Sequence, residues 1–239
     1  MKFLNTLLIL LIFSSSALYS KEQKKPEKAQ SVSLFDGKTL KGWQVCDYAG
    51  TGEIKVIPKE KTLLVSRGEI LSGVKLAEFN KKKLPTVNYE ISLEGRRVEG
   101  DDFFCCLTFP YNKTHATFVL GGWGGSVCGI SSIDFMDAME NSTMSVMDFT
   151  KAQWYKVRLI VTENRFQGFV DKKRIVNVGI KDRKIGMRFG EIEESIPLGI
   201  STFQTTGEFK NIKIRNMLNI ALFSLLVSFE GGILFFRLP

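Results

Sequence analysis

Histidine and the usual metal-binding cysteine spacings are almost absent from this sequence. Its 239 residues include one histidine and four cysteines, and no two cysteines have CxxC spacing. Zinc sites usually need several such ligands at short spacings, so the common zinc motifs are excluded. Cys105 and Cys106 are adjacent in a predicted strand, where neighbouring side chains point to opposite faces. We expect Cys46, Cys105, Cys106 and Cys128 to be buried free thiols, with a structural disulfide as the alternative.

Concentrated positive charge is also missing. The net charge is +8, but lysine and arginine are spread along the chain, with local runs only in KEQKK and in KKK at residues 81–83. No basic motif is interleaved with aromatic residues, so nucleic acid is not favoured as a partner. We expect a solvated basic surface, with contact to anionic membranes or polysaccharides as the weaker alternative.

Long apolar runs occur only at the two ends of the sequence. Residues 1–20 contain a lysine, the run FLNTLLILLIF and the small residues SSSA, which is typical of a secretory signal peptide, with an uncleaved anchor as the alternative. Residues 21–31 are charged and predict a flexible linker. Residues 217–239 form a hydrophobic tail interrupted by Glu230, so a membrane anchor, a packed tail and a reading-frame extension stay open. The sequence predicts export to the periplasm or cell envelope.

Between these ends, residues 32–216 show the two-residue period of β-strands. VNYEISLEGRRV alternates apolar and polar residues, DFFCCLTF is apolar on both faces, and WYKVRLIVTE alternates again. RFQGFV, DKKR and IVNV predict a hairpin around a charged turn. The intervals leave no room for βαβ crossovers, so we expect an all-β sandwich with few helices.

One stretch, GGWGGSVCGISSIDFMDAMEN at residues 121–141, is typical of a site more than of a scaffold. Glycine weakens a strand, so a cluster of four around Trp123 indicates a bend or the close approach of another molecule. An aromatic ring with room around it can stack on the apolar face of a sugar. The three acids that follow, Asp134, Asp137 and Glu140, fall in a predicted connecting loop.

Five blocks of the sequence resemble a known family. In order, they are SLFDGKTLKGW, GRRVEGDDFFCCLTFP, GGWGGSVCGISSIDFMDAMENST, QWYKVRLIVT and PLGISTFQTTGEFKNIKIR, between residues 33 and 215. This order and spacing is similar to the DUF1080 family, also called the 3-keto-disaccharide hydrolase domain. The resemblance implies a concanavalin-like jelly-roll sandwich of two antiparallel sheets, and sugar chemistry or sugar binding.

The ordinary glycosidase mechanism lacks its residues here. Jelly-roll glucanases place two carboxylates in an ExDxxE strand, and this sequence has no such motif. A 3-keto-glycoside allows another route, because the ketone acidifies the proton on C2 and the C1 substituent can leave by elimination before water adds back. That route needs a base, a cationic or hydrogen-bonding group for the enolate, and an acid. The candidate catalytic residues are Asp134, Asp137, Glu140, Arg96 and His115, and the candidate substrate-binding residues are Trp123, Arg97, Asn141 and Gln204.

Each candidate also has a structural explanation. Asp134 and Asp137 are suited to capping turns, the arginines to pairing with strand glutamates, and His115 to an ordinary strand position. We expect an exported carbohydrate-active hydrolase whose partner is a carbohydrate, with a non-catalytic carbohydrate-binding module or an inert envelope sandwich as alternatives. No cofactor is indicated, although the acidic loop offers oxygen ligands of the kind that calcium takes. We further expect Trp123, the acids and both arginines to converge on one hollow.

Overall fold

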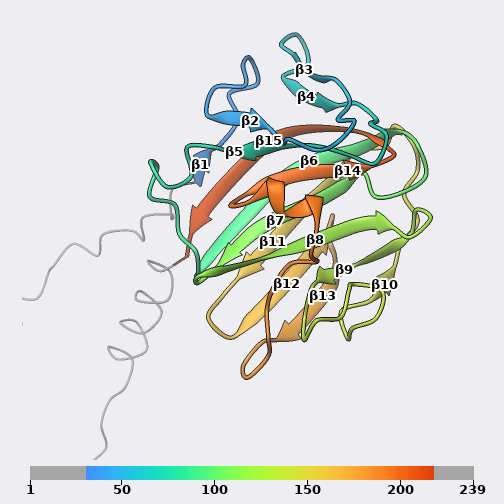
Figure 1. The fold of residues 1–239 in the computed structure, drawn as a ribbon. Coiled ribbons are helices and arrows are strands. Elements are labelled where there is room, and N and C mark those ends of the chain that lie inside the picture. Colours follow the sequence, from blue (N-terminus) through green and yellow to red (C-terminus); the bar gives the residue numbers. More distant parts are fainter. Residues whose placement is uncertain (1–30, 218–239) are drawn as a thin grey trace, which may run out of the picture.

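The chain folds as a sandwich of two antiparallel β-sheets. The computed structural model describes residues 31–217, and nearly all of these residues belong to strands or to the loops between them (Figure 1). The predicted signal peptide, nearly all of the predicted linker and the hydrophobic tail after Met217 lie outside the described residues. The all-β prediction is confirmed, and the arrangement is consistent with the expected jelly roll.

The larger sheet has eight strands, and the smaller has seven. The larger sheet runs in the order β13-β12-β11-β6-β15-β4-β3, with β1 paired to β15. Its strands are β1 (Ser31–Ser33), β3 (Ile54–Ile57), β4 (Thr62–Val65), β6 (Tyr89–Glu99), β11 (Tyr155–Val161), β12 (Arg165–Val170), β13 (Lys173–Gly179) and β15 (Thr206–Asn216). The smaller sheet runs β10-β9-β8-β7-β14-β5-β2, with β2 (Trp43–Val45), β5 (Leu71–Leu76), β7 (Cys105–Tyr111), β8 (Thr114–Gly122), β9 (Val127–Ser131), β10 (Ser145–Val146) and β14 (Gly199–Phe203).

The core lies between the sheets and follows the alternation in the sequence. On β6, Ile91 and Leu93 point inward and are almost fully buried, whereas Ser92 and Glu94 between them are partly exposed. Along β11, every second residue from Tyr155 to Val161 is buried in the same way. The predicted alternation of both strands is therefore confirmed, as is the β12–β13 hairpin.

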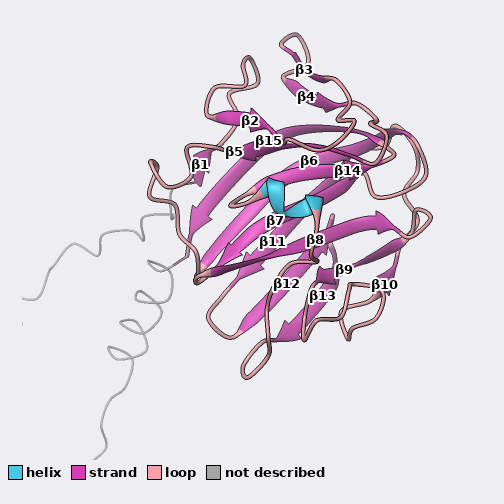
Figure 2. Cartoon of the chain, viewed as in Figure 1, coloured by secondary structure: helices cyan, strands magenta, loops and turns pink. Residues whose placement is uncertain are grey.

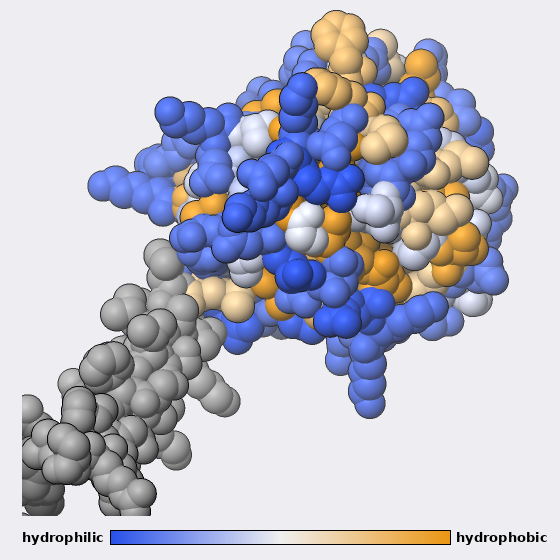
Figure 3. All heavy atoms as spheres, turned by 90° about the horizontal axis from the view of Figure 1, so that it is seen from below, coloured by the Kyte–Doolittle hydropathy of each residue, from blue (hydrophilic) through white to orange (hydrophobic). Residues whose placement is uncertain are grey.

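A short 3-10 helix, η1 (Glu191–Ser195), is the only helix among residues 31–217. It packs on β5 and β14 and lies in front of the seven-stranded sheet in Figure 2. No helix in this part of the chain has the length and apolarity to cross a bilayer. Seen from below in Figure 3, polar side chains cover most of the surface, and apolar groups are exposed among them.

The four cysteines are all buried and free, which confirms the prediction of buried thiols. Cys105 belongs to the main core, and Cys106 points to the opposite face of β7, as adjacent strand residues must. Burial raises the pKa of Cys46 and Cys128 to about 11 and that of Cys106 to about 12. These thiols are therefore protonated at neutral pH and are poor nucleophiles.

Candidate functional site

A pocket lies on the outer face of the seven-stranded sheet, the face turned away from the main core. Its floor includes Cys106, Thr117 and Val119, whereas the residues between them on the strands, such as Phe118, point into the core. Residues of the loop before β14 and of η1 form one wall. The volume is about 440 Å³, which is within the range of small-molecule sites.

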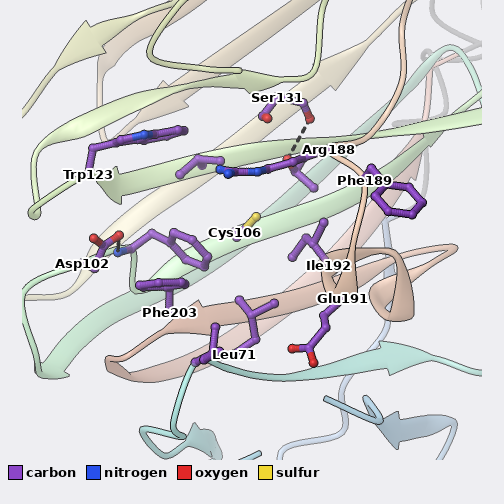
Figure 4. A pocket seen from close by; sticks show the side chains of 14 residues that line it. Leu71, Asp102, Cys106, Trp123, Ser131, Arg188, Phe189, Glu191, Ile192 and Phe203 are labelled. Carbon is purple, nitrogen blue, oxygen red and sulfur yellow. Dashed lines mark hydrogen bonds between the residues drawn. The ribbon is translucent and has the colours of Figure 1, made fainter. Parts of the chain in front are cut away.

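Charged and aromatic side chains enter the pocket from several elements (Figure 4). Trp123 stands on one side, and Arg188 extends into the hollow from the opposite side. Asp102 lies near the tryptophan, and Glu191 is the first residue of η1. Trp123 is 38% exposed, so its ring is open to a ligand. A dashed line in Figure 4 marks the hydroxyl of Thr117 donating to the backbone carbonyl of Ser131 at 2.7 Å.

Asp102 is fixed to the loop that carries the tryptophan. Its Oδ1 accepts the backbone N–H of Phe103 at 2.7 Å, and its Oδ2 accepts the backbone N–H of Gly124 at 3.1 Å. The Asp102 carboxylate is therefore held at a defined place beside Trp123.

The glycines around Trp123 make room for a buried arginine. Nη2 of Arg97 donates to the carbonyls of Asp102, Gly121 and Gly125 at 3.0, 3.3 and 2.9 Å. A Cβ on Gly121 would lie 2.5 Å from that nitrogen, and Gly121 and Gly125 have φ of +74° and +110°, which L side chains rarely adopt. Trp123 itself has φ of 50°. The glycine cluster thus serves the loop conformation that holds the ring, and the Arg97 guanidinium fastens it.

A family model described as the 3-keto-alpha-glucoside-1,2-lyase-like domain matches residues 30–215. The chain belongs to this family. The match spans all the strands of both sheets apart from the last residue of β15 and includes every residue that lines the pocket. The family resemblance stated from the sequence is therefore confirmed.

A solved structure with a TM-score above 0.5 supports the fold of this family member. The structure of the Crh5 transglycosylase is similar with a TM-score of 0.51 at 9% sequence identity, covering 80% of this chain and 85% of that one. The carbohydrate-binding module CBM66 from Bacillus subtilis has a TM-score of 0.45 at 13% identity and covers 73% and 96%. At these identities the likeness is one of fold alone. A search of curated proteins found no match.

Of the predicted site residues, Trp123 lines the pocket and the two arginines do not. Arg97 is 5% exposed and points into the sandwich, where burial lowers its pKa despite the nearby Asp101 and Asp102. Arg96 points the other way, to the outer face of the eight-stranded sheet, and its Nη2 lies 2.6 Å from a carboxylate oxygen of Glu208. The expectation that both arginines share a hollow with Trp123 is wrong, because neighbouring residues of β6 face opposite sides.

The three predicted acids follow β9 in one loop but differ in their contacts. Asp134 accepts hydrogen bonds from the backbone N–H of Lys184 and from Nε of Arg183, both at 2.8 Å, and the lysine N–H contributes most to lowering its pKa. Asp134 therefore joins two loops. Glu140 is exposed, and its carboxylate accepts the backbone N–H of Asp137 at 3.2 Å.

Asp137 is the predicted acid that lies nearest to the pocket. Its Oδ1 accepts the hydroxyl of Ser131 at 2.8 Å, and its Oδ2 lies 3.3 Å from Nη1 of Arg188. Both partners line the pocket. Asp137 is thus a neighbour that orients the pocket arginine and does not itself line the hollow.

The remaining predicted residues lie outside the pocket lining. Asn141 is buried, and its amide donates to the carbonyls of Ile130, Met136 and Asp137, so it holds the loop together. His115 is on β8, on the same face as the pocket residue Thr117 but beyond the lining, and burial lowers its pKa. Gln204 donates from Nε2 to the carbonyl of Glu69 at 3.1 Å.

Sequence reasoning missed several pocket residues, among them Asp102, Arg188, Phe189, Glu191 and Phe203. Asp102 had a local signal, since GDD follows a predicted strand directly and loops at strand ends carry functional groups. The others lie in segments without a repeating pattern. Within residues 31–217, no group of three or more His, Cys, Asp or Glu side chains is placed to hold a metal ion.

Proposed function

We propose that this chain is an exported carbohydrate-active protein that cleaves 3-keto-glycosides in the pocket on the outer face of the seven-stranded sheet. One observation carries the proposal: in a chain of this family, an open tryptophan ring, a guanidinium group and two carboxylates surround one hollow. These are the groups that sugar stacking and elimination next to a ketone require.

The proposed reaction begins with removal of the proton on C2, which the C3 ketone acidifies. The electron pair spreads over C2, C3 and the ketone oxygen as an enolate. Its return expels the C1 oxygen substituent, which takes up a proton and leaves as an alcohol, and a C1–C2 double bond remains in the sugar. Water then adds across that bond, with hydroxyl at C1 and a proton at C2, to give the free 3-keto sugar.

Three charged residues fit these steps. The Arg188 guanidinium, whose side chain is 65% exposed and held by Asp137, is the group proposed to stabilise the enolate oxygen. Glu191 is proposed to take the proton from C2 and to return it to the C1 oxygen that leaves, because it is the pocket carboxylate that receives only one long hydrogen bond, at 3.4 Å from the backbone N–H of Ala49. Asp102, already bonded to two backbone amides, is suited to bind sugar hydroxyls beside Trp123.

The test is cleavage of 3-keto methyl α-glucoside by the full chain, followed by NMR of the sugar product. Glu191→Gln should slow cleavage about 10²–10⁴-fold, the usual contribution of a general acid or base. The matched control is Glu193→Gln, an exposed glutamate two residues further along η1 that does not line the pocket. Equal rates in the two variants would remove Glu191 from the mechanism.

A second candidate is a carbohydrate-binding module without catalysis. It is favoured by the two backbone N–H groups that already occupy the Asp102 carboxylate, and by the position of the single histidine beyond the pocket. Binding of the 3-keto sugar by the unmodified protein with no turnover would support this candidate over the enzyme.

Export and membrane attachment are proposals that rest on the sequence of the termini. Residues 1–20 are proposed to be removed as a signal peptide, and residues 217–239 to attach the protein to a membrane. Mass determination of the mature protein tests the first. Truncation after Asn216 tests the second, because an anchored protein should lose its need for detergent, and equal solubility of the two forms would argue against an anchor.

A further inference from the structure

The pocket has a polar end and an apolar end, which lie over different strands of the seven-stranded sheet. At one end, Ser131 of β9 lies opposite Thr117 of β8. At the other, Phe203 of β14 lies opposite Leu71 of β5. Since the sheet runs β9-β8-β7-β14-β5, two strand steps lie between Thr117 and Phe203. Adjacent strands are about 4.8 Å apart, and Phe203 is four residues along β14 from Gly199, the residue in line with Thr117, so Thr117 and Phe203 are about 16 Å apart.

The apolar end is continuous. Phe103 and Ile192 pack against two satellite clusters of buried residues, one around Leu71 and the other around Cys106 and Val119. The ring of Phe103 lies 5.6 Å from that of Phe203. At the rim, Ile70 is 46% exposed. Figure 4 shows Phe203, Leu71 and Ile192 together on the side of the pocket away from Trp123 and Ser131.

The apolar end of the pocket is not suited to bind a second sugar. Sugar hydroxyls buried against aliphatic and aromatic carbon lose their bonds to water without gaining others, which is unfavourable. An alkyl or aryl group instead gains about fourfold in affinity for each methylene that leaves water. Glu191, the residue before Ile192 in η1, is the carboxylate on this side of the pocket.

We propose, within the function proposed above, that the substrates are 3-keto-glycosides with an apolar alkyl or aryl aglycone. The sugar ring lies at the polar end, between Trp123 and Arg188, and the aglycone lies on Phe103, Phe203 and Ile70. In the elimination, the aglycone leaves as an alcohol or phenol after its oxygen takes a proton, and the sugar keeps the new C1–C2 double bond.

The experiment is calorimetric binding to the full chain of the 3-keto derivatives of methyl, butyl and hexyl α-glucoside and of maltose, all below micelle-forming concentrations. Affinity should rise steeply from methyl to butyl, toward fourfold per methylene, and maltose should bind at least tenfold more weakly than the butyl compound. Ile70→Ser should flatten the rise but leave the methyl compound unchanged. Val98→Ser, which changes a similarly exposed apolar residue outside the pocket, should leave the rise intact.

The outcomes separate this inference from the function on which it rests. If all the sugars are cleaved but affinity is flat along the alkyl series, or highest for maltose, the aglycone assignment is overturned and the proposed cleavage stands. If affinity rises equally steeply with alkyl length in the Ile70→Ser and Val98→Ser variants, the alkyl chain binds elsewhere. That result would also overturn the aglycone assignment. If no 3-keto sugar is bound or cleaved, both proposals fail.

Discussion

The outer faces of the two sheets both carry a tryptophan and arginines, but they use them differently. On the eight-stranded sheet, the Trp154 ring lies between Arg96 and Lys210, with Cζ and Nζ at 4.7 and 4.0 Å from its centroid. Arg96 also pairs with Glu208, and Lys210 pairs with Glu94. On the seven-stranded sheet, the Trp123 ring is open and Arg188 extends into a hollow. The same side-chain types therefore make a site only where their partners leave surface for a ligand.

The largest expected difference between the faces is in catalysis. Arg188→Met removes the cation proposed to stabilise the enolate and should lower kcat for 3-keto-glycoside cleavage by about 10²–10³-fold. Arg165→Met, a matched loss of an exposed arginine on β12 that bonds to Asn177, should leave kcat unchanged. The measurement is steady-state kinetics, and similar losses in both variants would break the distinction between the two faces.

The neighbouring Arg96 and Arg97 should affect the stability of the protein for different reasons. Each replacement by Met should lower the free energy of unfolding by about 3 kcal/mol. Loss of Arg96 leaves the buried Glu208 carboxylate unpaired, and loss of Arg97 leaves backbone carbonyls unpaired. Adding Glu208→Leu should restore most of the loss in the Arg96 variant and none in the Arg97 variant. Urea denaturation of the single and double variants checks this, and rescue of both would contradict it.

The two tryptophans should differ about tenfold in their effect on ligand affinity. Trp123→Ala removes the ring proposed to stack on the sugar, which is worth roughly 1.4 kcal/mol. Trp154→Ala removes a ring already held between two cations and should leave affinity unchanged. Calorimetry with 3-keto methyl α-glucoside measures both, and unchanged affinity in the Trp123 variant would remove the ring from the site.

The smallest effect concerns the acidic loop beside the pocket. Hydrogen bonds from Lys184 and Arg183 hold the pKa of Asp134 below its ordinary value of 3.8. Its stabilising contribution is therefore present above about pH 4 and is lost as the pH falls through the lowered pKa. Asp134→Asn should lower Tm slightly at pH 7 and not at pH 2. The control is Asp148→Asn, an exposed aspartate, which should not change Tm at either pH, and equal shifts would contradict the structural role.

The sandwich could be predicted from the sequence because its strands obey a local rule. Alternation in β6 and β11 identified the buried residues without knowledge of their partners. The same rule places Arg96 and Arg97 on opposite faces of the strand. The alternation in VNYEISLEGRRV alone therefore argued against placing both arginines in one hollow. The resemblance supplied the family and the sugar chemistry. Trp123 was found from its glycines, and two of these, Gly121 and Gly125, lie against the Arg97 side chain.

The rest of the pocket depends on contacts between distant segments. Arg188 reaches Asp137 because the loop before η1 pairs with the loop after β9, through Ile133 and Ile185. Neither loop has a repeating pattern, so residue types alone do not show that they meet. Glu191 and Phe203 reach the pocket through the same long-range packing.

The Arg97 guanidinium ties the two layers of the protein together at the pocket edge. It begins on a strand of the eight-stranded sheet and ends on carbonyls of a turn that belongs to the seven-stranded sheet. If one layer slid over the other, the indole would be displaced from the floor beneath it. The shape of the binding surface consequently depends on the relative position of the two sheets. A shift between the sheets would therefore first change the contacts of a ligand stacked on Trp123.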